Sequence, residues 1–178
     1  MSLPKPADPA KLFVSAIYAD REKFALCCRR LEERFGPSDY QSKEIAFAES
    51  SYYHEEMGQP LYRQFLSYRD LIRPEDLPAI KLFTNALEVE VAGAGRRVVN
   101  LDPGYLNLLH LILATGKKGS HRPYLGQGIY ADLSLIYESR TFKALRWTYP
   151  DYAGEAVIGM LNRLREVYKD QLRQVEKG

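Results

Sequence analysis

Residues 11–37 read KLFVSAIYADREKFALCCRRLEERFGP and predict a strand followed by a helix. The first eight residues are almost continuously apolar, which is typical of a central strand. Asp20 can cap the helix, because its carboxylate can accept hydrogen bonds from amides that the first turn leaves unpaired. Apolar residues then recur at helical spacing from Phe24 to Phe35, and the Gly36-Pro37 pair predicts the end of the helix.

The chain up to residue 101 continues this alternation of strands and helices. Residues 44–49 and 61–68 are strand-like, and the polar stretch between them is too long for a tight hairpin. A helix begins near Pro74, although residues 87–91 alone would also fit a strand. Its apolar stripe consists of Leu77, Ile80, Thr84, Leu87 and Val91. A short strand at 97–101 then leads into Asp102-Pro103-Gly104, which is typical of a turn. The order β-α-β-β-α-β is that of a ferredoxin-like sheet with two helices on one face.

The remaining residues extend this sheet. Three further strands are predicted, and they cover residues 108–115, 129–137 and 141–145. The strand at 129–137 alternates, with Tyr130, Asp132 and Ser134 on the polar face. A last amphipathic helix begins near residue 154. We therefore expect an α+β fold with a ferredoxin-like βαββαβ core, an antiparallel sheet extended by C-terminal strands, and a final helix.

Length and composition predict one ordinary domain. The chain has 178 residues, of which 46% are hydrophobic, and 25 basic against 23 acidic side chains. A chain of this length can bury about 70% of its unfolded surface, so its core needs no metal or disulfide. We expect residues 1–10 to form a flexible N-terminal arm and residues 11–178 to form a single α+β domain.

The sequence excludes several classes of protein. Its apolar stretches fall far short of the roughly 20 residues that span a bilayer, and no signal segment opens the chain. We therefore expect a soluble, cytoplasmic protein that does not bind membranes. Cys27 and Cys28 are adjacent, which disfavours a disulfide, and they lie on the apolar helix face as core thiols. A net charge of +2 does not predict a dedicated nucleic-acid binder. An open sheet edge would permit a homodimer.

Polar residues gather first around the predicted turn at 102–104. Asn100, Asp102 and Tyr105 lie there, and Asp102 could bind Mg²⁺ or act as a general base. Alternatively, Asp102 accepts hydrogen bonds from the amides of its own turn.

A second candidate cluster is the glycine-rich basic loop at 116–128. It contains Lys117, Lys118, Ser120, His121 and Arg122. Such a loop suits an anion, because glycine lets backbone amides approach it and arginine can bind it through two donors. The alternative is a solvated loop between two strands. His121 is the candidate acid–base group, since His110 lies in an apolar strand and His54 in an acidic loop.

The last two clusters lie at 125–132 and 146–152. The Gly126-x-Gly128 pair precedes a strand, which excludes a dinucleotide fingerprint. Tyr130 and Asp132 would share a pocket with Asp102 if their strand ends were adjacent. Further along, the aromatic rings of Trp147 and Tyr149 could stack on a planar ligand. Alternatively, Asp151 caps the last helix and Trp147 packs under it.

Short distinctive stretches occur along the whole chain. They are residues 11–14, 35–40, 53–58, 81–85, 100–105, 120–122, 128–131 and 147–152. Together they resemble a family of small, uncharacterised bacterial and archaeal proteins whose members are commonly labelled GTP-binding. The resemblance implies a guanine nucleotide as a ligand. The sequence lacks the Gly-x4-Gly-Lys-Ser/Thr phosphate loop and the Asn-Lys-x-Asp guanine motif, so such a site would be of a different kind.

Two functional hypotheses follow. The first is a protein that binds, or acts on, a phosphorylated small molecule such as a nucleotide, in a pocket at strand ends. Catalytic roles would fall to His121, Asp102 and Asp132. The ligand-binding residues would be Asn100, Tyr105, Lys117, Lys118, Ser120, Arg122, Tyr130, Trp147, Tyr149 and Asp151. No resident metal site is predicted, and Mg²⁺ would accompany a nucleotide. The alternative is an interaction module that binds RNA or a protein on its sheet face.

Overall fold

The computed structural model describes residues 3–47, 53, 56–93 and 96–175. The strands are β1 (Ala10–Tyr18), β2 (Ser38–Gln41), β3 (Ile45–Ala46), β4 (Tyr62–Ile72), β5 (Val99–Leu106), β6 (His110–Thr115), β7 (Tyr124–Gly126), β8 (Ile129–Glu138) and β9 (Thr141–Ala144). The helices are α1 (Arg21–Phe35), α3 (Leu77–Val91), α4 (Pro150–Ala153) and α5 (Glu155–Val175), and a 3-10 turn, η1 (Pro74–Asp76), precedes α3.

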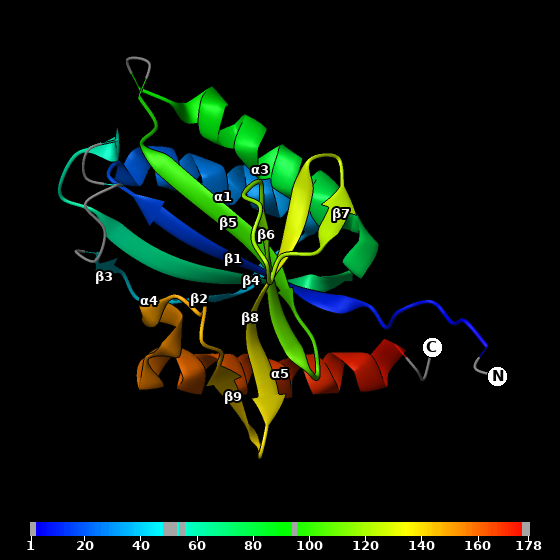
Figure 1. The fold of residues 1–178 in the computed structure, drawn as a ribbon. Helices are drawn as coiled ribbons and strands as arrows, with labels where there is room; N and C mark the ends of the chain where they lie inside the picture. Colours follow the sequence, from blue (N-terminus) through cyan, green and yellow to red (C-terminus); the bar gives the residue numbers. More distant parts are fainter. Residues whose placement is uncertain (1–2, 48–52, 54–55, 94–95, 176–178) are drawn as a thin grey trace.

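Within these residues, the strands form one antiparallel sheet in the order β2-β4-β1-β5-β6-β8-β7. β3 pairs with β4, and β9 pairs with β8. The part β2-β4-β1-β5, with α1 and α3 on one face, is the predicted ferredoxin-like core (Figure 1). The α+β prediction is therefore confirmed, including the sheet extension by C-terminal strands and the final helix.

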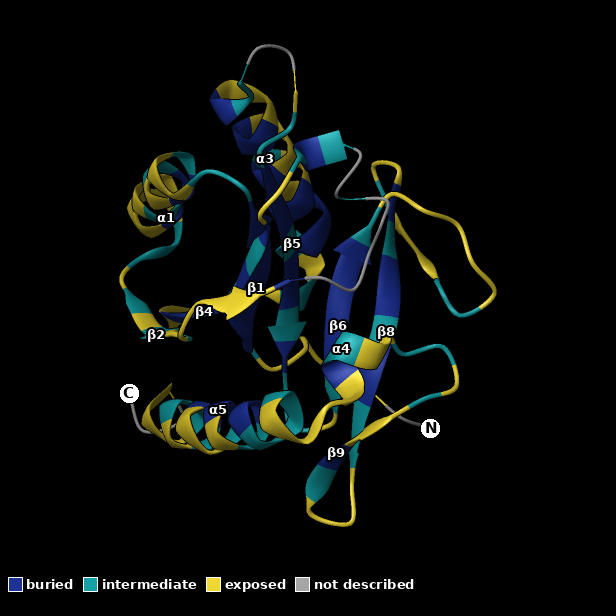
Figure 2. Ribbon diagram, turned by 90° about the vertical axis from the view of Figure 1, so that its left-hand side faces the viewer, coloured by how far each residue is buried: buried dark blue, intermediate teal, exposed yellow. Residues whose placement is uncertain are grey.

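Helices cover both faces of the central strands. Every residue of β1 is buried. On the α1 and α3 face, Val14 and Ala16 pack against Leu31 of α1 and Leu87 of α3. On the other face, α5 packs against β1, β4, β6 and β8 through Met160, Leu161, Leu164 and Tyr168. The sheet therefore lies between two helical layers, as the buried strands in Figure 2 show.

The predicted turn at Asp102-Pro103-Gly104 is wrong, because β5 runs straight through these residues to Leu106. Pairing of β5 with β6 starts only at Gly104, so Pro103 lies where β5 has no β6 partner and its missing N–H costs no bond there. A Cβ at Gly104 would lie 2.2 Å from the Ile112 carbonyl oxygen. This glycine allows close approach of β6 and does not mark a turn.

The predicted clean alternation of β8 is also wrong. Leu111 pairs with Leu135, whereas the next residue of β6, Ile112, pairs with Leu133. Ser134 is therefore an extra residue on β8 and forms a β-bulge. Because of this bulge, residues at every second position before and after Ser134 point to opposite faces of the sheet. Ile129 and Ala131 pack beside Leu77 of α3, whereas Leu135 and Tyr137 pack in the α5 layer.

Smaller differences concern short strands and turns. β2 and β7 were not predicted, because strands of three or four edge residues carry little apolar pattern. Within the described residues, the strand expected at 44–49 covers Ile45–Ala46, and its residues 48 and 49 lie outside them. Cys27 and Cys28 are free thiols as predicted, and burial raises their pKa values to about 12 and about 11.

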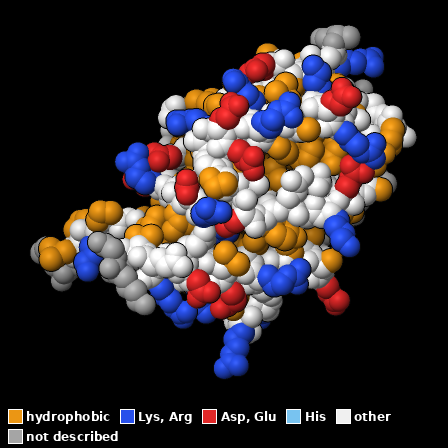
Figure 3. All heavy atoms as spheres, turned by 180° about the vertical axis from the view of Figure 1, so that it is seen from behind, with side chains coloured by type: hydrophobic (Ala, Val, Ile, Leu, Met, Phe, Trp, Pro, Cys, Tyr) orange, Lys and Arg blue, Asp and Glu red, His pale blue; other side chains and the backbone are white. Residues whose placement is uncertain are grey.

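The surface carries both signs of charge. Acidic and basic side chains are interspersed with apolar ones over the face shown in Figure 3. Among the described residues, no helix combines the length and the apolar character needed to cross a membrane.

Candidate functional site

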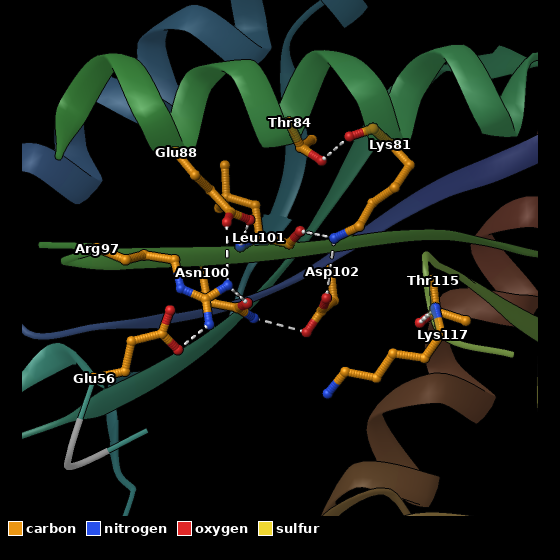
Figure 4. A network of polar contacts seen from close by, with 10 residues as sticks. All are labelled: Glu56, Lys81, Thr84, Glu88, Arg97, Asn100, Leu101, Asp102, Thr115 and Lys117. Atoms are coloured by element: carbon orange, nitrogen blue, oxygen red, sulfur yellow. Dashed lines mark hydrogen bonds and ion pairs between the residues drawn. The ribbon is translucent and has the colours of Figure 1, made fainter. Parts of the chain in front are cut away.

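A polar cluster occupies the place where β5 and β6 separate. These strands pair only from Gly104 to Leu106, although β5 begins earlier and β6 continues to Thr115. Lys81 of α3 reaches β5 here, and its Nζ donates to the Leu101 carbonyl at 2.9 Å and to Asp102 Oδ1 at 3.2 Å (Figure 4). The separation of the two strands thus leaves a polar region inside the three-layer fold.

Glu88, Arg97 and Asn100 continue this network along β5 (Figure 4). The Leu101 amide donates to Glu88 Oε1 at 2.7 Å, which fixes a carboxylate on the buried side of α3. Arg97 Nη1 donates to Asn100 Oδ1 at 2.8 Å and to Glu88 Oε2 at 3.3 Å. Arg97 Nη2 donates to Glu56 Oε2 at 2.6 Å. Asn100 Nδ2 donates to Asp102 Oδ2 at 2.7 Å.

Arg63 of β4 forms the other half of the cluster. Its side chain is 8% exposed, and its Nη1 donates to Asp151 Oδ2 on α4. The guanidinium lies 4.6 Å from the ring centre of Phe47 and 5.6 Å from that of Tyr152. Among the residues that the structure describes, its buried Nε has no hydrogen-bond partner. The name central cluster is used below for Tyr53, Glu56, Arg63, Lys81, Glu88, Arg97, Asn100, Asp102, Asp151 and Tyr152.

Tyr53 connects the two halves of the central cluster. The Arg97 guanidinium lies 5.7 Å from its ring centre, and its ring contacts that of Phe47 edge-on. Burial raises the pKa of Tyr53, and the charges of Asp102, Arg97 and Arg63 also act on it. Tyr53 therefore lies within electrostatic reach of both arginines.

The pKa values of Asp102 and Glu88, two carboxylates of the β5 network, shift in opposite directions. Burial alone would raise the pKa of Asp102, but the Lys81 ammonium and the Asn100 hydrogen bond outweigh it and lower this pKa below its usual value. Burial dominates at Glu88 and raises its pKa, although Lys81 opposes this. Asp102 is therefore ionised at neutral pH.

A second group, the outer cluster, consists of His121, Arg122, Asp132, Trp147 and Tyr149. Arg122 Nε donates to Asp132 Oδ2 at 2.7 Å, and its Nη2 donates to the Tyr149 hydroxyl at 3.3 Å. His121 Nε2 lies 3.7 Å from Asp132 Oδ2, and its ring stacks on Trp147 with centres 5.0 Å apart. The Trp147 indole donates to the Leu133 carbonyl at 2.8 Å.

The structure thus brings together eight of the predicted site residues in two neighbouring groups. Asn100, Asp102 and Asp151 lie in the central cluster, and the other five form the outer cluster. Asp102 and Asp132 share a face of the sheet, since Asp132 pairs with Leu113 and Leu113 with Gly104. β6 lies between their strands. Tyr149 of the outer cluster contributes to the raised pKa of Tyr53 in the central cluster, so the two clusters lie close enough to interact electrostatically.

The remaining predicted residues lie elsewhere. Tyr105 packs beside the Leu77 cluster on the opposite face of the sheet from Asp102. Tyr130 contacts Tyr124 at the β7 edge, with ring centres 5.1 Å apart. Lys118 and Ser120 are exposed in the loop. Lys117 is also exposed, and its side chain points toward the central cluster in Figure 4.

Two further observations bear on the predicted roles of these residues. Trp147 already contacts the rings or cations of His121 and Arg146, which leaves the 52% exposed Tyr149 as the better stacking surface. Asp151 pairs with Arg63 and does not cap a helix. His54, the third histidine, lies outside the described residues. The described residues contain no group of three or more His, Cys, Asp or Glu placed to hold a metal ion.

Sequence reasoning missed seven residues of the central cluster, which are Tyr53, Glu56, Arg63, Lys81, Glu88, Arg97 and Tyr152. Among them, Arg63, Lys81 and Glu88 each interrupt an apolar pattern, which was the available signal. Lys81 and Glu88 follow Leu77 and Thr84 by four residues each, so they share the buried stripe of α3. Arg63 lies among apolar residues of β4. Buried charges at such places need partners, and here the partners belong to the central cluster.

A separate groove of about 310 Å³ lies between α1 and α3. Among its lining residues, Arg73 pairs with Asp76, with Nη2 and Oδ1 2.6 Å apart, and Arg34 lies over the Phe35 ring. Its charges are thus engaged locally, and none of the predicted site residues reaches it.

Many α+β proteins share an antiparallel sheet between helical layers and a partly buried polar cluster. The family to which the chain belongs is shown by its sequence. Residues 8–168 match a domain of unknown function, DUF4416, and the chain belongs to this family. This supports the expected membership of an uncharacterised family. No curated protein and no solved structure matches the chain.

Proposed function

We propose that this protein binds a phosphorylated small molecule at the central cluster. The observation that carries the proposal is the Nε–H group of Arg63, a buried donor without an acceptor in the described part of the chain. Arg97 Nε in the same cluster is also buried and unpartnered. Buried donors are nearly always paired in folded proteins, by protein, water or a bound ion. Two unpaired guanidinium donors in one cluster favour an oxyanion as the missing partner.

The geometry of the Arg63 pair supports an oxyanion ligand in particular. Arg63 contacts Asp151 through Nη1 alone. The edge of the guanidinium that carries Nε–H is the one that commonly grips phosphate or carboxylate through two parallel bonds. The ion pair with Asp151 therefore holds Arg63 in place and leaves this edge for a ligand.

The central cluster is accessible from outside. The side chain of Asp102 is 32% exposed, that of Glu56 36% and that of Arg97 24%. Lys117 of the loop points toward the cluster (Figure 4), and the exposed Tyr149 immediately precedes α4, whose Asp151 binds Arg63. A small molecule could thus reach the arginines while its outer part contacts Lys117 or stacks on Tyr149.

The proposal also includes the roles predicted for His121, a nucleotide and Mg²⁺. His121 is its candidate acid–base group, because it lies beside the carboxylate of Asp132 at the edge of the site. A nucleotide, as the GTP-binding label of similar proteins implies, is one member of the proposed ligand class. Mg²⁺ enters the proposal only as the companion of such a nucleotide.

The alternative, an RNA or protein platform on the sheet face, receives less support. Such modules bind on an exposed sheet face through aromatic side chains. Here α1 and α3 cover one face of the central strands and α5 covers the other, and all of β1 is buried.

A thermal-shift screen over phosphorylated and carboxylated small molecules tests the proposal. A ligand at a hundred times its dissociation constant stabilises by about 2.7 kcal/mol, which raises the melting temperature by roughly 5 to 10 °C at this size. We expect Arg63→Lys to lose this shift, since lysine keeps the charge but not the two-donor edge. Arg165→Lys is the matched control, because Arg165 is also a partly buried arginine that lies over a ring, outside the cluster.

Two results would contradict the proposal. One is the absence of a shift with every phosphorylated compound. The other is an equal shift in the wild type and the Arg63→Lys variant.

A further inference from the structure

The central cluster also contains an unpartnered acceptor. Asp151 Oδ2 binds Arg63, whereas Asp151 Oδ1 is buried and has no hydrogen-bond partner within residues 3–47, 53, 56–93 and 96–175. The Asp151 side chain is 16% exposed, and that of Arg63 is 8% exposed. One ion pair therefore presents both an unused donor, Arg63 Nε–H, and an unused acceptor, Asp151 Oδ1.

This pairing constrains the ligand. The phosphate group of a monoester, which is mostly doubly ionised at neutral pH, offers acceptors, which suit Arg63, but it offers no donor to Asp151, and its charge repels that carboxylate. A hydroxyl group carries an O–H donor and can satisfy Asp151 Oδ1. A ligand that fits both atoms thus carries an oxyanion and a hydroxyl group close to each other.

The charge balance limits the number of phosphates. The central cluster holds four carboxylates, which are Glu56, Glu88, Asp102 and Asp151. Against them stand three cations, which are Arg63, Lys81 and Arg97. A triphosphate would bring several negative charges into a cluster without surplus positive charge. A single phosphate group is the better match.

Resting on the proposed function, we propose that the ligand is a phosphate monoester of a hydroxylated molecule. The phosphate binds the Nε edge of Arg63, and a nearby hydroxyl group donates to Asp151 Oδ1. A free sugar phosphate and a nucleoside monophosphate share this chemistry. The difference between them is the base, for which the exposed ring of Tyr149, two residues before Asp151, is the candidate stacking surface.

Isothermal titration calorimetry on the full chain tests this ligand class. The probes are ribose 5-phosphate, GMP, GTP and ethyl phosphate, a monoester without a hydroxyl group. We expect ribose 5-phosphate or GMP to bind at least tenfold more tightly than ethyl phosphate and GTP. Tighter binding of GMP identifies the nucleotide as the source of the monoester, and equal binding identifies the sugar phosphate.

The variant Asp151→Asn locates the hydroxyl contact. We expect it to lower the affinity for ribose 5-phosphate by a larger factor than the affinity for ethyl phosphate, because only ribose 5-phosphate has a hydroxyl group whose charged acceptor is replaced by a neutral one. The comparison of probes on the wild type needs no variant, so it decides the question even if Asp151→Asn folds poorly.

The two proposals fail in different ways. If ethyl phosphate or GTP binds as tightly as ribose 5-phosphate and GMP, the proposal of a hydroxylated phosphate monoester is contradicted. The proposed binding of phosphate at Arg63 is then retained. If no phosphorylated probe binds, the proposed function itself is wrong, and the ligand class falls with it.

Discussion

Lys11 on β1 and Arg63 on β4 are buried cations on neighbouring strands, and they differ in how their donors are used. Lys11 Nζ donates to Asp39 Oδ2 at 2.5 Å, to the Tyr68 carbonyl at 3.0 Å and to Gln171 Oε1 at 3.0 Å. An ammonium has three donors, and all three are engaged. Arg63 has five N–H donors. Among the described residues, its Nη1 donates to Asp151, whereas its buried Nε has no acceptor.

This difference separates a structural charge from a candidate ligand-binding charge. The Lys11 group joins β1, β2, β4 and α5, and it leaves no donor for another molecule. The Arg63 group is held by one ion pair and by aromatic rings, with an edge left for an acceptor. Burial of a charge alone therefore does not indicate a binding site, whereas buried donors without partners do.

The largest predicted effect concerns Lys11. Replacing it with Met leaves the Asp39 carboxylate without its ammonium, and loss of one member of a buried pair costs about 3 to 5 kcal/mol. We expect Lys11→Met to lower the free energy of unfolding in urea by this amount and to leave ligand affinity unchanged. A loss below about 1 kcal/mol, or a change in ligand affinity, would remove the distinction between the two groups.

A smaller effect on stability is expected at Arg63. Lysine at this position can still pair with Asp151, so we expect Arg63→Lys to lower the free energy of unfolding by about 1 to 2 kcal/mol. Its ligand-induced thermal shift should vanish. If Arg63→Lys destabilises the protein as much as Lys11→Met does, Arg63 is primarily structural.

The smallest predicted effect is a pH dependence in the central cluster. Burial raises the pKa of Glu88 in the folded protein, so the unfolded chain loses this proton first as pH rises. Glu88 therefore lowers stability progressively as pH rises from about 4.5 through its raised pKa. We expect the unfolding free energy of the wild type, relative to Glu88→Gln, to fall over this range.

Urea titrations at several pH values measure this difference. Glu90→Gln is the control, because Glu90 lies two residues along the same helix and is about half exposed. A wild-type stability that rises with pH relative to Glu88→Gln would mean that Lys81 and Arg97 outweigh the burial of this carboxylate.

The sequence could predict those parts of the fold that depend on local patterns. The apolar run of β1 and the helical spacings of α1, α3 and α5 are of this kind. Gly104 and Ser134 were misinterpreted because their roles depend on another strand, namely the close approach of β6 and the register between β6 and β8.

In the candidate site, too, contacts between residues far apart in the sequence could not be predicted. Asp102 and Asp151 could be named as polar residues near strand and helix ends. The partner of Asp151 is Arg63, 88 residues earlier in the chain, and that of Asp102 is Lys81, 21 residues earlier. Arg63 and Lys81 stand out in the sequence only as charges within apolar patterns, and long-range packing decides what they contact.

Binding of a phosphate group by Arg63 is tested most directly by ¹H–¹⁵N NMR of the Arg63 Nε–H group. The Arg63→Lys variant assigns this resonance, because the variant lacks it. We predict that ribose 5-phosphate shifts this resonance strongly, whereas the Arg165 Nε–H resonance, whose group donates to the Leu108 carbonyl, stays in place. An Arg63 resonance that does not move at saturating ribose 5-phosphate, GMP and inorganic phosphate would contradict the account.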